Sequence, residues 1–139
     1  MSKEKIEFGD FQTPLELAEI ACERLVTLGV SPDVIIEPTC GVGAFVIASV
    51  NYFPSTKKVY GIDINSGYLD VLEGALCGHP RQNVVSIEHG DFFRYDWVGK
   101  SSDVDGNLLV LGNLPWVTNT VQSKIDSYNV PEKDNVVGL

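Results

Sequence analysis

Apolar positions along the chain follow two different spacings, which predict an alternation of helices and short strands. Residues 14–28 carry an apolar stripe at helical spacing with glutamates on the opposite side. Thr13, Pro14 and Glu16 form the pattern of a capping box with proline at the first helical position. We therefore expect a helix that Thr13 caps and that ends before Gly29.

Short apolar runs predict four strands, at residues 33–38, 57–64, 83–91 and 107–113. Two further helices are expected between them, at 40–53 and 66–77. Strands that are continuous apolar runs and alternate with helices are typical of a parallel sheet with helices on both faces, an α/β fold. In such sheets ligands bind outside the carboxyl ends of the strands.

Composition limits the number of domains and the partners that this chain can bind. The 139 residues suffice for one domain, and ten Lys and Arg against nineteen Asp and Glu give a net charge of −9. Phosphate backbones would be repelled by this charge, so we do not expect the segment by itself to hold nucleic acid firmly. Three cysteines without metal-ligand spacing predict reduced thiols and no metal site. No apolar run is long enough for a membrane span, so we expect none. The N-terminus lacks a signal-peptide pattern, which predicts a cytoplasmic protein.

Polar and glycine-rich segments follow each predicted strand, at residues 37–43, 63–65, 90–92 and 113–116. The glycine turn in the first segment lets backbone approach a ligand and directs a helix N-terminus at it, although a plain strand-to-helix turn is an alternative. A Walker loop is excluded because no Gly-Lys-Ser/Thr is present, and Val46 stands where a dinucleotide fingerprint needs a small residue.

Two aspartates at neighbouring strand ends are candidates for nucleoside binding. Asp63 can accept both ribose hydroxyls, and Asp91 with Phe92 can read the amine and the face of an adenine. Asp63 could instead cap a helix or face solvent, and Phe92 could be an ordinary core or surface aromatic. No basic residue lies nearby in sequence for a pyrophosphate, so the pattern favours a nucleoside.

Five short motifs, "FQTP", "EPTCGVGAF", "GIDIN", "GDFF" and "NLPW", occur in this order over about residues 8–118. In order and spacing they resemble S-adenosylmethionine-dependent amino-methyltransferases, above all the N6-adenine DNA methyltransferases of restriction–modification systems. The resemblance implies a Rossmann-like class I methyltransferase fold with strand order 3-2-1-4-5-7-6 and S-adenosyl-L-methionine as cofactor. It implies that Thr13 reaches the cofactor carboxylate, that the glycine turn cradles the methionine end and that Asp63 holds the ribose. The cofactor-binding residues implied are Phe11, Gln12, Thr13, Pro14, Glu37, Pro38, Thr39, Cys40, Gly41, Gly43, Asp63, Ile64, Asp91, Phe92 and Asn113.

The motif Asn113-Leu114-Pro115-Trp116 is interpreted as the catalytic loop. The side-chain oxygen of Asn113 and the backbone carbonyl of Leu114 would accept hydrogen bonds from the target amine. Pro115 restricts Leu114 to an extended conformation, and Trp116 offers a face on which a flipped base can stack. The family usually has proline where Leu114 stands, so the carbonyl is kept but the loop loses stiffness. A strand-ending turn with a core Trp116 is the alternative.

Other functions fit parts of the same pattern. Glutamine methyltransferases that act on translation release factors share the NLPW-type motif, and RNA methylation is a further alternative within the enzyme class. A cofactor- or partner-binding module without activity is the alternative from another class. The "FQTP" segment and Cys40 favour the DNA-type interpretation.

Four predicted strands are fewer than the seven of the resembled fold. We therefore expect residues 1–118 to be a partial methyltransferase core, truncated after its fourth strand, and residues 119–139 to be a polar loop or tail. The isolated chain is expected to be inactive, and DNA would be held by missing regions or a partner chain. An open fourth strand also predicts a homodimer through that edge.

Overall fold

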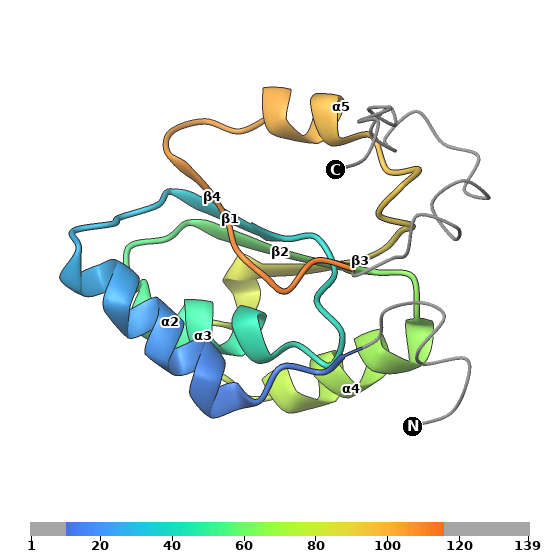
Figure 1. The fold of residues 1–139 in the computed structure, drawn as a ribbon, viewed down its shortest axis with the longest axis horizontal. Coiled ribbons are helices and arrows are strands. Elements are labelled where there is room, and N and C mark those ends of the chain that lie inside the picture. The colour runs from blue at the N-terminus through green and yellow to red at the C-terminus, as the bar shows by residue number, and fades with distance from the viewer. Residues whose placement is uncertain (1–10, 116–139) are drawn as a thin grey trace, which may run out of the picture.

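A four-stranded parallel sheet forms the centre of the computed structural model, which describes residues 11–115 (Figure 1). The sheet order is β3-β2-β1-β4, which confirms the first four strands of the predicted order. Each strand is short because its apolar run is short. The strands are β1 (Val34–Glu37), β2 (Lys58–Asp63), β3 (Val85–His89) and β4 (Leu108–Val110).

The strand register brings the carboxyl ends of the strands to one edge of the sheet. Glu37 at the end of β1 lies opposite Gly61 of β2, and Asp63 at the end of β2 lies opposite His89 of β3. On the other side of β1, Ile36 pairs with Val110, and the Leu111 amide continues the ladder by donating to the Ile36 carbonyl at 3.0 Å. All four candidate segments therefore leave the sheet at the same edge.

Helices lie on both faces of the sheet, as expected, but unequally (Figure 1). One face carries three helices, α2 (Leu15–Thr27), α3 (Ala44–Tyr52) and α4 (Ser66–Leu76). Helix α3 is apolar nearly all round because it packs between α2 and the sheet, and it buries Val46, Ala48 and Val50. The opposite face carries only α5 (Trp97–Ser102), a helix that the sequence analysis missed. A short 3-10 helix, η1 (Gln82–Val84), precedes β3.

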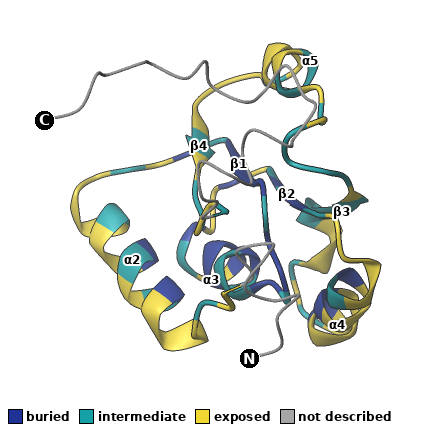
Figure 2. Ribbon diagram, turned by 45° about the vertical axis from the view of Figure 1, so that its right-hand side comes forward, coloured by how far each residue is buried: buried dark blue, intermediate teal, exposed yellow. Residues whose placement is uncertain are grey.

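Burial is concentrated on the three-helix side (Figure 2). Strand β1 is buried along its whole length, whereas Leu108 and Val110 of β4 keep 37% and 57% of their surface exposed. The expectation that every strand is covered on both faces therefore holds only for β1. In the described part of the chain β4 pairs with β1 alone, which leaves its other edge open.

The start of α2 differs from the predicted capping box. Pro14 is the N-cap, with φ −59° and ψ 141°, and no side chain makes a capping hydrogen bond there. Its carbonyl accepts from the amides of Leu17 and Ala18 at 3.1 and 3.2 Å. Because the extended ψ of Pro14 keeps that residue outside the helix, Thr13 lies one position too early to cap it, and the capping-box prediction is wrong.

Charged side chains attach α5 to the sheet. Lys100 Nζ donates to Glu88 Oε1 at 2.6 Å, the Tyr95 hydroxyl donates to the other carboxylate oxygen, and the ammonium lies 3.6 Å from the centre of the Tyr60 ring. Trp97 and Tyr95 stack nearby, with ring centres 4.4 Å apart. This helix is therefore held by an ion pair and aromatic contacts more than by aliphatic burial.

None of the described helices is long and apolar enough to cross a membrane. Trp116 and the predicted tail, residues 119–139, lie outside the described residues.

Candidate functional site

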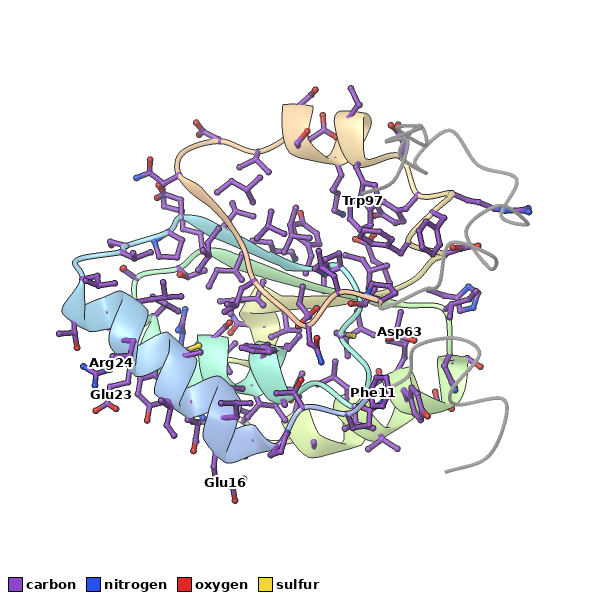
Figure 3. All side chains as sticks on the ribbon, viewed as in Figure 1. Phe11, Glu16, Glu23, Arg24, Asp63 and Trp97 are labelled. Carbon is purple, nitrogen blue, oxygen red and sulfur yellow. The ribbon has the colours of Figure 1, made fainter. Side chains whose placement is uncertain are left out.

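The predicted site residues of the described chain gather at the carboxyl edge of the sheet. Figure 3 shows Asp63 at this edge, with Phe11 on the side of α4 and Trp97 on the side of α5. The segments that meet here are 11–14, 37–43, 63–65, 90–92 and 112–115, and they contain no lysine or arginine.

Asp63 connects the end of β2 to the glycine turn. One carboxylate oxygen, Oδ2, accepts from the Gly41 amide at 2.8 Å, and the other, Oδ1, accepts from the Asn65 amide at 2.8 Å. Asn65 in turn caps α4 by accepting from the Tyr68 amide. The carboxylate predicted to hold a ribose thus also fixes the backbone on both sides of the site.

The two glycines of the turn are required for different reasons. Gly43 has φ +96°, and a Cβ there would lie 2.1 Å from Leu72 Cδ1 of α4. Gly41 has φ +54°, and a Cβ there would lie 2.4 Å from Gln12 Oε1. Gln12 Oε1 also accepts from the Val42 amide at 3.1 Å, so the segment before α2 rests on the turn. The "FQTP" and "EPTCG" motifs are therefore neighbours in space.

Glu37 is a carboxyl group buried beneath the turn, with 2% of its surface exposed. The pKa of Glu37 is raised to about 8, chiefly by burial and also by the nearby Asp63 charge, while a hydrogen bond from the Thr39 amide at 3.1 Å lowers it. Burial also raises the pKa of the Cys40 thiol. Both groups are therefore mainly protonated at neutral pH.

The loop after β4 lies against the glycine turn. Thr39 Oγ1 donates to the backbone carbonyl of Asn113 at 3.1 Å. Gly112, Asn113, Leu114 and Pro115 line an open hollow of about 350 Å³, and Leu114 keeps 47% of its surface exposed. Asn113 and Leu114, the two predicted acceptor residues, therefore border this hollow.

The segment after β3 lies beside the end of β2. The Gly90 amide donates to the Asp63 carbonyl at 3.0 Å, which brings Asp91 next to that strand. Asp91 Oδ1 accepts from the Phe93 amide at 2.9 Å, and Oδ2 lies 3.8 Å from Arg94 Nε.

Phe92 is part of an aromatic cluster rather than a lone ring. Its ring centre lies 5.2 Å from that of Phe93 and 5.7 Å from that of Trp97, and its carbonyl accepts from Trp97 Nε1 at 2.7 Å. The predicted adenine contact and the alternative of an ordinary packed aromatic are thus compatible for this half-buried residue.

Sequence reasoning missed two contributors to the site. Gly112 is needed because a Cβ there would lie 2.1 Å from Glu37 Oε1. Trp97 supports the carbonyl and ring of Phe92 from α5. Neither Gly112 nor Trp97 belongs to a sequence pattern that would indicate these contacts. In residues 11–115 no group of three or more His, Cys, Asp or Glu could hold a metal ion.

Comparisons with known proteins agree with this geometry. The family model described as N-6 DNA methylase matches residues 1–135. A type II methyltransferase of Nostoc, M.NspV, is 49% identical over 135 residues, which are 97% of this chain and 28% of that protein. The chain therefore spans less than a third of this relative's length.

Solved structures with a similar fold are also methyltransferases by name. Trm5 of Methanocaldococcus jannaschii, in complex with adenosine, has a TM-score of 0.53 and 25% identity, over 82% of this chain and 32% of that one. A Pyrococcus horikoshii protein assigned as an RNA methyltransferase has a TM-score of 0.59 and 18% identity, over 80% of this chain and 51% of that one. These likenesses confirm the Rossmann-like methyltransferase fold.

Proposed function

The chain belongs to the N-6 DNA methylase family, and from this premise we propose that it supplies the S-adenosylmethionine site of an adenine-specific DNA methyltransferase. In the proposed reaction the methyl group moves from the cofactor sulfonium to the N6 amine of adenine, and the amine loses one proton. The relative M.NspV, a type II methyltransferase, supports a role in restriction–modification. Residues 1–118 form the proposed cofactor-binding core.

One observation carries the cofactor assignment: the Asp63 carboxylate holds the glycine turn through the Gly41 amide at 2.8 Å. A carboxylate oxygen has more than one lone pair, so Asp63 can accept ribose hydroxyls while it keeps this bond. The segments at the edge offer acidic side chains and no lysine or arginine, which suits a cationic sulfonium and ammonium better than a pyrophosphate. In this proposal the segment Phe11–Pro14 and the backbone of Glu37–Gly43 surround the methionine end, Asp63 and Ile64 the ribose, and Asp91 and Phe92 the adenine.

The proposed catalytic step depends on positioned acceptors. The lone pair of an exocyclic amine is delocalised into the purine ring, so the amine must become pyramidal before it can attack. The Asn113 side-chain oxygen and the Leu114 carbonyl would accept its two protons and favour that geometry, and Trp116 would stack on the base. The open hollow lined by Gly112–Pro115 supports this assignment, because both acceptor residues border it.

DNA would be held mainly by polypeptide other than the described residues. The net charge of −9 opposes phosphate contacts, and specific DNA binding normally relies on Lys and Arg. The open edge of β4 supports pairing with a further strand, from a longer chain or a second copy. The proposed activity is cytoplasmic, which the similarity to the type II methyltransferase M.NspV supports.

A labelled-methyl assay tests the proposed function. The active form that contains this chain would be incubated with radiolabelled S-adenosylmethionine and duplex DNA, and Asn113→Ala is expected to lose at least about 100-fold in turnover while cofactor affinity changes little, because the amide acts on the target amine. If the label appears in RNA or in a release-factor glutamine and not in DNA, the proposed substrate is wrong. If Asn113→Ala keeps wild-type turnover, the catalytic role proposed for this loop is wrong.

A further inference from the structure

Thr39 and Glu37 join the cofactor turn to the catalytic loop, although the two loops are far apart in sequence. We propose that Thr39 is a positioning residue that holds the Asn113 carbonyl, while the Glu37 side chain and Gly112 fix the distance between the loops. This inference rests on the proposed function, and it gives Thr39 a role different from the cofactor contact expected from its motif.

The hydrogen bond from Thr39 determines how the peptide group after Asn113 is oriented. Thr39 Oγ1 donates to the Asn113 carbonyl at 3.1 Å across a separation of 74 residues. Within residues 11–115 the ladder between β1 and β4 ends at the Leu111 amide, which donates to the Ile36 carbonyl. Beyond that bond, the Thr39 hydroxyl fixes a peptide plane within the loop. Because Pro115 restricts Leu114 to extended conformations, the Leu114 carbonyl then points in a defined direction.

The carboxyl group of Glu37 sets how closely the loops approach. It is almost fully buried, with 2% exposure, and it accepts from the Thr39 amide at 3.1 Å. A Cβ at position 112 would lie 2.1 Å from Glu37 Oε1 and 2.5 Å from Cδ, so the Gly112 backbone lies directly against the carboxyl group. Glycine is needed here for contact and not for a positive φ. Glu37, Thr39, Gly112 and Asn113 thus form one connected unit, the loop bracket.

The loop bracket connects the glycine turn after β1, where the cofactor is proposed to bind, to the catalytic loop after β4. If the Thr39 hydroxyl acts on the catalytic loop, its removal must disturb the amine acceptors and leave cofactor binding nearly unchanged. If it bound the cofactor instead, its removal would weaken cofactor binding directly. A valine at position 39 keeps the shape and removes only the hydroxyl, and a serine keeps the hydroxyl.

Hydrogen–deuterium exchange of the 139-residue chain tests the bracket without any assay of activity. Thr39→Val is expected to raise exchange at the Leu111 amide, which bonds the Ile36 carbonyl at the start of the loop, about threefold to tenfold, the equivalent of one ordinary hydrogen bond, and Thr39→Ser is expected to keep wild-type rates. Thr27→Val is the matched control, since the Thr27 hydroxyl bonds the Glu23 carbonyl on α2, far from the loop in sequence. If valine disturbs folding, Thr39→Ala makes the same test.

Cofactor titration and turnover then separate the outcomes. In the active form, Thr39→Val should lower kcat about threefold to tenfold and leave the KM for S-adenosylmethionine within about twofold, with rescue by Thr39→Ser. Unchanged loop exchange, or weakened cofactor binding with unchanged kcat, would overturn the proposal. Raised loop exchange in a chain that binds no S-adenosylmethionine would support the bracket and refute the proposed function.

Discussion

The buried carboxyl of Glu37 makes the stability of the chain depend on pH in an unusual direction. Its pKa is about 8, against an ordinary value of 4.5, so the folded state keeps a proton that the unfolded chain releases between these values. Stability from this group is complete below pH 4.5 and declines as the pH rises toward 8. Glu37→Gln replaces the carboxyl with a neutral group of similar shape that cannot ionise.

The size of the effect follows from the width of this window. Each pH unit within it changes the free energy of unfolding by about 1.4 kcal/mol, so the 3.5 units between 4.5 and 8 correspond to about 5 kcal/mol as an upper bound. Between about pH 5.5 and about pH 7.5 the wild type should lose roughly 2–3 kcal/mol relative to Glu37→Gln.

Urea unfolding at several pH values measures this difference, with the free energy extrapolated linearly to water. Glu23→Gln, at an exposed position of α2, is the matched control and should keep the wild-type pH dependence. Parallel curves for wild type and Glu37→Gln would show that Glu37 ionises normally in the folded state and would refute the reasoning.

Three further results are expected. Asp63→Ala should weaken S-adenosylmethionine binding by about 1–3 kcal/mol, because ligand hydroxyls lose a buried partner; calorimetry with NAD as comparison checks this, and equal binding of NAD would contradict the assigned cofactor. Gly43→Ala should lower the free energy of unfolding by about 2 kcal/mol or more, since its Cβ would lie 2.1 Å from Leu72 Cδ1 at φ +96°, whereas Gly74→Ala, with nothing within 4 Å, should not destabilise. The 139-residue chain should self-associate through the open edge of β4 and bind duplex DNA only weakly; size-exclusion chromatography that shows a monodisperse monomer would contradict the first part.

The strands could be predicted because short apolar runs such as Val34–Ile36 determine them locally. Their order was implied by the resemblance to the methyltransferase family, and the sheet confirms it for the four strands described. Asp63 ends β2, and Asp91 and Asn113 lie two and three residues beyond the ends of β3 and β4, so parallel pairing brings their segments to one edge.

Contacts between distant residues could not be predicted in this way. The Thr39–Asn113 hydrogen bond and the Glu37–Gly112 contact depend on how two loops approach after the sheet forms. The raised pKa of Glu37 likewise depends on burial, which no sequence window reveals. Helix α5 was missed because six residues that include Gly99 give no usable helical period.

The unequal covering of the sheet means that its two faces should respond oppositely to salt. The face under α2, α3 and α4 depends on apolar burial, which excluded salts such as sulfate strengthen. The face under α5 depends on the Lys100–Glu88 pair, which is partly exposed and is therefore screened as ionic strength rises. A concentrated excluded salt would therefore stabilise the packing of α2, α3 and α4 on the sheet and weaken the attachment of α5. Trp97 of α5 supports Phe92, which is proposed to contact the adenine of the cofactor. This part of the proposed site should therefore weaken as the salt concentration rises.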